Sequence, residues 1–79
     1  MIQMYTTPTC GHCSRLKSQL DRVGIDYEEI NVEDNPIAAQ YVMRLNGGVA
    51  LVPTVVLPNG SALTNPTVVQ IRQRLAALA

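Results

Sequence analysis

The chain has 79 residues, six basic and six acidic side chains, and 47% apolar residues. This length predicts one domain over 1–79, and the apolar content excludes a disordered chain. Zero net charge, with no Trp or Phe, gives no basic and aromatic surface for nucleic acid and no attraction to a membrane. No apolar run is long enough to cross a bilayer, and the first residues lack a signal-peptide pattern. We therefore expect a cytoplasmic protein with reduced cysteines.

The first third of the chain predicts a strand, a helix and a second strand. Residues 2–6 are apolar or β-prone, and a short loop then leads to Cys10. Apolar residues recur at helical spacing after the loop, and Gly24 is a typical helix end. These apolar residues are Leu16, Leu20 and Val23. Residues 25–32 predict a strand whose polar content suits the edge of a sheet.

Two asparagine–proline pairs, Asn35-Pro36 and Asn65-Pro66, predict the starts of two further helices. Their apolar faces are Ile37, Tyr41 and Leu45 in one helix, and Val68, Ile71, Leu75 and Leu78 in the other. Between them, residues 54–57 predict a buried strand, residues 58–61 a hairpin turn, and residues 62–63 the return strand. The order β-α-β-α-β-β-α predicts an α/β fold of the thioredoxin-like type, with a four-stranded mixed sheet and three helices.

The two cysteines, Cys10 and Cys13, lie three residues apart at the start of the first predicted helix. A structural zinc site needs four ligands, and only His12 lies beside the pair, so we expect no metal. A structural disulfide over so short a loop would stabilise the fold little. The sequence therefore favours a redox-active pair.

The position of Cys10 at a helix N-terminus suits it to attack disulfides. A free thiol has a pKa of about 8.5, and such sites lower it to roughly 3.5–7.5. Cys13, one turn further in, is placed to resolve a mixed disulfide formed on Cys10. Gly11 leaves space for the sulfur of a partner. His12 either favours the Cys10 thiolate as an imidazolium or is an exposed loop histidine without a specific contact.

Pro53 follows Val52 at the start of a predicted strand, where either a cis or the commoner trans peptide bond is possible. With Cys10-Gly-His-Cys13 and Val52-Pro53-Thr54 in place, the chain resembles the glutaredoxin family along nearly its whole length. The resemblance implies that Cys10 is the nucleophile and Cys13 resolves. It also implies that Pro53 is cis and faces the cysteines, and that the Val52 backbone pairs with a bound thiol.

Within the family, the chain is most similar to mycoredoxins. The matching segments are Tyr5-Thr-Thr-x-x-Cys10-Gly-x-Cys13, Asn46-Gly-Gly48 with Val52-Pro-Thr54, and Asn59-Gly-Ser-x-Leu-Thr-Asn-Pro66. Thr7 stands where glutathione-dependent members often have lysine, and their Gly-Gly-x-Asp turn is absent. The resemblance implies a monomer without a tightly bound cofactor, which uses mycothiol as co-substrate to reduce protein mixed disulfides. The expected thiol-binding residues are Thr9, Gly11, His12, Val52, Pro53, Thr64 and Asn65.

Two other functions remain open for a chain of this kind. One is a dithiol redoxin recycled by thioredoxin reductase, for instance as a donor to ribonucleotide reductase. Such redoxins usually carry a Trp-Ser-Gly-Phe turn, and this chain has neither Trp nor Phe. The other is a carrier that binds an iron–sulfur cluster between two copies, which a usable second cysteine disfavours.

Overall fold

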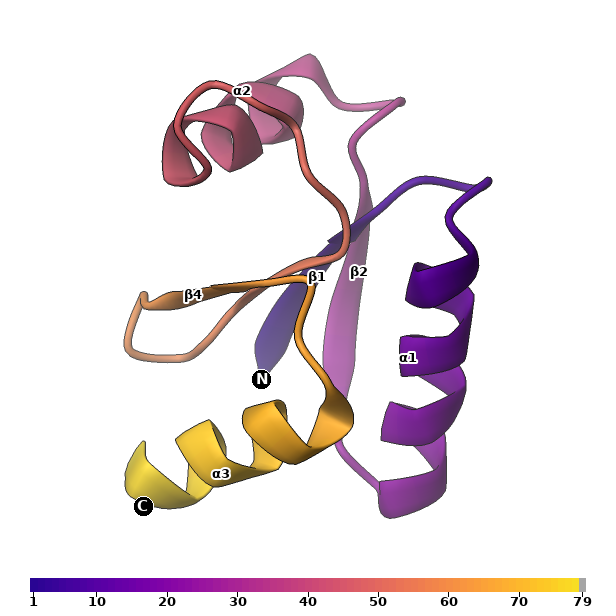
Figure 1. Cartoon of the computed structure of the whole chain (residues 1–79), viewed down its shortest axis with the longest axis vertical. Coiled ribbons are helices and arrows are strands. Elements are labelled where there is room, and N and C mark those ends of the chain that lie inside the picture. Colours follow the sequence, from indigo (N-terminus) through magenta and orange to yellow (C-terminus); the bar gives the residue numbers. More distant parts are fainter. Residues whose placement is uncertain (79) are drawn as a thin grey trace.

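The computed structural model describes residues 1–78 and has the predicted order of elements (Figure 1). The elements are β1 (Ile2–Thr6), α1 (Gly11–Val23), β2 (Tyr27–Asn31), α2 (Pro36–Leu45), β3 (Thr54–Val56), β4 (Ala62–Thr64) and α3 (Val68–Leu78). The strand order is β2-β1-β3-β4, with β1 parallel to β2 and antiparallel to β3. β4 pairs antiparallel with β3. The thioredoxin-like fold and the edge position of β2 are thus confirmed.

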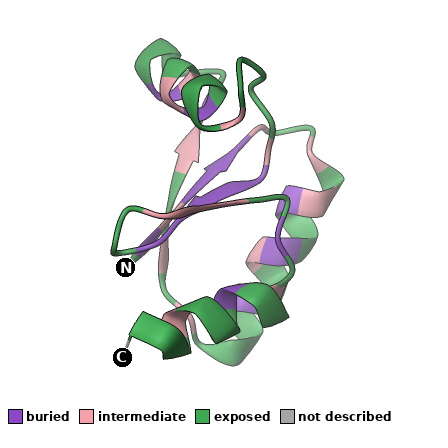
Figure 2. Cartoon of the chain, turned by 60° about the vertical axis from the view of Figure 1, so that its left-hand side comes forward, coloured by how far each residue is buried: buried purple, intermediate pink, exposed green. Residues whose placement is uncertain are grey.

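Side chains that alternate along the central strands build two cores, one on each face of the sheet. Met4 and Val55 pack with residues of α1 and α3. Their neighbours Tyr5 and Val56 pack with residues of α2. Figure 2 shows this burial concentrated on the central strands and on the inner sides of the helices. α1 and α3 therefore cover one face of the sheet, and α2 covers the other.

The apolar face predicted for α2 was partly wrong. Tyr41 packs against the core as expected, but Ile37 and Leu45 are not among the buried residues of α2. Its buried residues are Ala38 and Val42, whereas Ile37 is 79% exposed and Leu45 is 38% exposed. The predicted residues (Ile37, Tyr41 and Leu45) and the buried residues (Ala38 and Val42) form two neighbouring rows on the helix, about 100° apart, and both rows contain apolar residues. The predicted inner position of Val23 in α1 was also wrong, since it is 41% exposed.

The N-terminus of α3 also differs from the prediction. The helix is capped by Thr67 rather than Asn65, and Gln70 completes a reciprocal capping box. The Gln70 N–H donates to Thr67 Oγ1 at 3.1 Å, and the Thr67 N–H donates to Gln70 Oε1 at 2.9 Å. Asn65 instead adopts a left-handed conformation with φ of 52°. No helix within residues 1–78 has the length and apolar character needed to span a membrane.

Candidate active site

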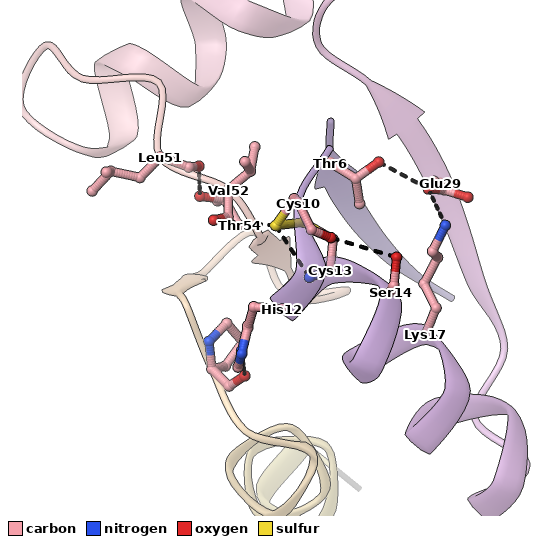
Figure 3. The surroundings of a disulfide bond; sticks show 11 residues. Thr6, Cys10, His12, Cys13, Ser14, Lys17, Glu29, Leu51, Val52 and Thr54 are labelled. Carbon is pink, nitrogen blue, oxygen red and sulfur yellow. Dashed lines mark hydrogen bonds and ion pairs between the residues drawn. A yellow bond between two sulfur atoms is a disulfide. The ribbon is translucent and has the colours of Figure 1, made fainter. Parts of the chain in front are cut away.

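Cys10 is the N-cap residue of α1, at the point where the chain turns from the β1 loop into the helix (Figure 3). It is half-buried, whereas Cys13, in the first turn, is only 1% exposed. The two are joined by a disulfide, with their Cα atoms 5.2 Å apart. A partner can therefore reach Cys10 first, and Cys13 lies behind it within bonding distance.

The surroundings of Cys10 favour a negative charge on its sulfur. The Cys13 N–H donates to Cys10 Sγ at 3.1 Å, as a capping residue requires. The first turn of α1 contains no acidic residue that would oppose a charge there. Once the disulfide is reduced, this N–H and the positive end of the helix dipole stabilise the thiolate over the thiol.

Val52 and Pro53 form the wall opposite the cysteines. The bond between them is cis, as the family resemblance implied. The carbonyl oxygen of Val52 lies 3.9 Å from Cys10 Sγ. The Val52 side chain packs against both cores. Pro53 is buried, and its carbonyl accepts the Asn65 N–H at 2.8 Å. The structure thus brings Cys10, Val52, Pro53 and Asn65 together.

His12 makes a specific contact across the active-site turn. Its Nε2 lies 3.2 Å from the carbonyl oxygen of Pro66, so the ring N–H donates to that carbonyl. The interpretation of His12 as a contact-free loop histidine is therefore wrong. The bond ties the cysteine turn to the loop that precedes α3. This loop begins with Asn65, directly after Thr64 at the end of β4, and both residues are exposed.

Thr9 and Gly11 flank Cys10 on the surface, and both are exposed. A Cβ atom added at Gly11 would find its nearest neighbour, Arg15 Nη1, at 3.6 Å, which is an ordinary contact. The fold itself therefore does not require glycine at this position. Its small size leaves the space outside Cys10 open to a partner.

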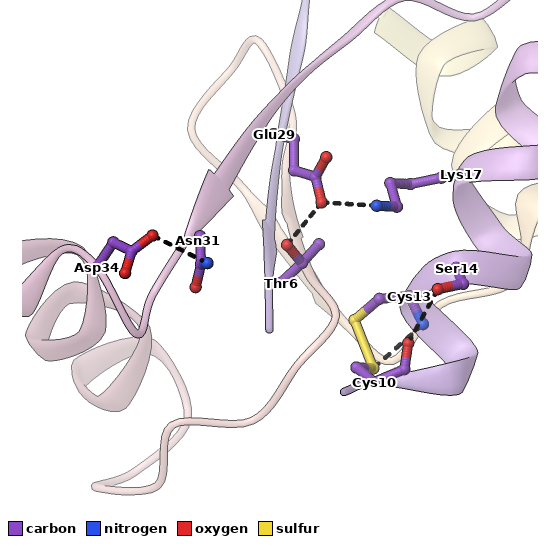
Figure 4. A network of polar contacts seen from close by, with 8 residues as sticks. All are labelled: Thr6, Cys10, Cys13, Ser14, Lys17, Glu29, Asn31 and Asp34. Carbon is purple, nitrogen blue, oxygen red and sulfur yellow. Dashed lines mark hydrogen bonds and ion pairs between the residues drawn. A yellow bond between two sulfur atoms is a disulfide. The ribbon is translucent and has the colours of Figure 1, made fainter. Parts of the chain in front are cut away.

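A second polar cluster lies between α1 and β2, close to the active-site turn (Figure 4). The hydroxyl of the buried Thr6 donates to Glu29 Oε2 at 2.8 Å, and Lys17 Nζ donates to the same oxygen at 2.9 Å. The bond from Lys17 lowers the pKa of Glu29, and the bond to Glu29 raises the pKa of Lys17. The cluster holds α1 against the sheet edge. Within residues 1–78, no three His, Cys, Asp or Glu side chains gather as metal ligands would.

One residue that contributes to the site was missed in the sequence. The half-buried Asn46 lies at the end of α2. Its side chain forms hydrogen bonds with Thr54, next to Pro53, and with the exposed Thr64 at the end of β4. In the sequence, the segment Asn46-Gly-Gly48 contributed to the resemblance to mycoredoxins. Nothing in the local pattern indicated that the Asn46 side chain reaches two strands far along the chain.

A half-buried capping cysteine with a fully buried partner one turn behind it, on a thioredoxin-like fold, defines a thiol–disulfide oxidoreductase. The glutaredoxin family model matches residues 2–62 of this chain. The protein therefore belongs to the glutaredoxin family, whose members exchange thiols and disulfides.

Named relatives agree with this assignment over almost the full chain. A Mycobacterium tuberculosis protein that carries a glutaredoxin name is 42% identical over 78 residues, which is 99% of this chain and 93% of the relative. Mycoredoxin 1 of Corynebacterium glutamicum is 33% identical over 99% of this chain and 96% of its own length. The crystal structure of a glutaredoxin from Archaeoglobus fulgidus superposes with a TM-score of 0.75 and 26% identity. It covers 91% of this chain and 82% of that one.

Proposed function

We propose that this protein reduces mixed disulfides between proteins and mycothiol with Cys10 as the nucleophile, and that Cys13 resolves the Cys10 adduct only in a side reaction that forms the internal disulfide. The observation that carries the proposal is the contrast between the two cysteines. Cys10 is accessible and accepts a backbone N–H, whereas Cys13 is 1% exposed behind it. The choice of mycothiol is supported by the likeness to Mycoredoxin 1 and by the missing acidic turn before α3.

The reaction proceeds by two thiol–disulfide exchanges. The Cys10 thiolate attacks the mycothiol sulfur of the mixed disulfide, forms a Cys10–mycothiol disulfide and expels the target cysteine as a thiolate, which takes a proton from water. A second mycothiol thiolate then attacks the mycothiol sulfur of this adduct. Mycothiol disulfide leaves, and Cys10 regains its thiolate. The target gains two electrons, which mycothiol supplies.

The small thiol is held in the groove between Cys10 and the Val52–Pro53 wall. No hydrogen bond between described residues uses the Val52 N–H, so an extended ligand can pair with this peptide as an added strand would. Thr64 and Asn65 form the outer rim of the groove, and Thr9, Gly11 and His12 surround the entry to Cys10. We expect the protein to act as a cytoplasmic monomer of one domain, without a tightly bound cofactor.

A second candidate is a dithiol redoxin recycled by thioredoxin reductase. It is favoured by the disulfide between Cys10 and Cys13, whose Cα separation of 5.2 Å lies in the usual range. In that route, Cys13 attacks the Cys10 sulfur of the mixed disulfide, expels the bound thiol and leaves an internal disulfide that needs two electrons from the reductase.

A Cys13→Ser variant separates the two routes. We expect it to retain turnover of a protein–mycothiol mixed disulfide in the presence of free mycothiol, since only Cys10 exchanges in the proposed cycle. Cys10→Ser is the matched control and should be inactive. Complete loss of turnover in Cys13→Ser would show that both cysteines are required and would favour the dithiol route.

A further inference from the structure

A chain of side-chain hydrogen bonds runs from the rim of the groove to the loop that carries Val52. The Thr64 hydroxyl donates to Asn46 Oδ1. Asn46 Nδ2 donates to Thr54 Oγ1 at 3.2 Å. Thr54 Oγ1 in turn donates to the Leu51 carbonyl at 2.8 Å (Figure 3). Three segments that are distant in the sequence thus meet at one carboxamide.

The donors and acceptors in this chain leave Asn46 only one orientation. Thr54 is completely buried and has a single hydroxyl proton, which it gives to Leu51. Its oxygen therefore accepts from Asn46, and only the NH₂ group of the amide can donate. The second proton of that group goes to the Val42 carbonyl at 2.8 Å, in the last turn of α2. The Asn46 carbonyl oxygen is left to accept from Thr64.

This chain of hydrogen bonds ends at the peptide group between Leu51 and Val52. Because the Leu51 carbonyl is bonded inward to Thr54, it is not available to the groove. The next carbonyl, that of Val52, is the one that lies 3.9 Å from Cys10 Sγ. The direction of the Leu51 carbonyl thus sets which backbone groups face the bound thiol.

We propose that Asn46 is a positioning residue for thiol binding: its carboxamide aligns the Val52 peptide and the Thr64 rim as one preformed groove beside Cys10. This inference rests on the proposed function, because it concerns the groove that receives the small thiol. Among the described residues, no hydrogen bond joins Asn46 to either cysteine, so Asn46 acts on binding of the mixed disulfide and leaves the chemistry of the cysteine pair unchanged.

The variant that tests the proposal is Asn46→Asp. A carboxylate has nearly the same shape and still accepts from Thr64, but it has no proton for Thr54 or for the Val42 carbonyl. The Thr54 hydroxyl is then drawn to the carboxylate, and the Leu51 carbonyl is released. We expect the KM for a protein–mycothiol mixed disulfide to rise about tenfold with kcat nearly unchanged. The reduction potential of the Cys10–Cys13 pair should not change.

Two further variants make the test specific. Thr54→Val breaks the same hydrogen-bond chain at the link between Asn46 and the Leu51 carbonyl, and Thr54→Ser preserves this link. We expect Thr54→Val to raise KM like Asn46→Asp, the double variant to add little to either, and Thr54→Ser to resemble the wild type. Ile2→Val is a stability control, because Ile2 begins β1 and the active-site loop follows the other end of this strand. We expect it to lower the free energy of unfolding without changing KM.

The outcomes distinguish this inference from the proposed function. If wild-type protein does not turn over the mycothiol substrate, the proposed function fails, and the same variants are compared with the disulfide that it does reduce. The positioning role is overturned if Asn46→Asp leaves KM unchanged. It is also overturned if kcat and the reduction potential of Asn46→Asp change together with KM. The same holds if Ile2→Val raises KM as much as Asn46→Asp does when the two variants have the same free energy of unfolding.

Discussion

Asn65 is the one non-glycine residue within 1–78 that has a positive φ, and this conformation can be tested quantitatively. At φ of 52°, it lies in the left-handed region, which costs ordinary residues roughly 1–2 kcal/mol. Asparagine is among the residues that visit this region, and glycine does so without penalty. We therefore expect Asn65→Ala to lower the free energy of unfolding by about 1 kcal/mol relative to Asn65→Gly. In a domain of this size, that difference shifts Tm by about 4–8 °C.

Urea unfolding of the reduced proteins, followed by far-UV circular dichroism, measures this difference directly. Asn65→Gly keeps the backbone bond from the Asn65 N–H to the Pro53 carbonyl and removes only the side chain. If Asn65→Ala and Asn65→Gly unfold at the same urea concentration with equal slopes, the backbone argument is refuted. The glycine variant also isolates the binding role: we expect its KM for the mixed disulfide to rise while its stability is maintained.

Three further predictions concern the scaffold around the site. The lowered pKa of Glu29 means that its contribution to stability is complete above its ordinary value of 4.5 and is lost as pH falls through the folded value. Glu29→Gln should thus flatten the acid limb of a plot of unfolding free energy against pH, and an unchanged limb would contradict this. Thr67→Ala should cost about 1 kcal/mol in urea unfolding, because it removes the cap of α3; no loss would place the cap elsewhere. Ile71→Ala should cost about 2–5 kcal/mol, since Ile71 is fully buried, and a cost below that of Thr67→Ala would contradict the core assignment.

Local sequence patterns predicted the elements well and their tertiary contacts less well. The strand and helix order, and the capping position of Cys10, follow from periodicity and turn residues that lie close together in the chain. The face of α2 does not, because Ile37 and Ala38 begin two adjacent apolar series, and only packing against the sheet selects between them. The cap of α3 was assigned to Asn65 because Asn-Pro is a common helix start. The Thr67–Gln70 pair two residues later satisfies the same backbone groups reciprocally.

The polar side chains that shape the groove were the hardest to predict. Asn46 and Thr64 are 18 positions apart, and no periodicity relates them. Their contact exists because β4 pairs with β3, which brings the end of β4 to the end of α2. His12 posed the same difficulty, since the carbonyl that it contacts lies 54 residues away.

The central claim is that mycothiol recycles Cys10, and the choice of reductant tests it most directly. The protein is given a mixed-disulfide substrate with mycothiol, its reductase and NADPH, then with glutathione and its reductase, and then with thioredoxin reductase alone. Loss of NADPH absorbance reports turnover. We predict turnover with mycothiol and little with the other two systems. Turnover with thioredoxin reductase alone would contradict the claim. Cys10 and Cys13 would then still exchange disulfides, but the protein would be a dithiol redoxin.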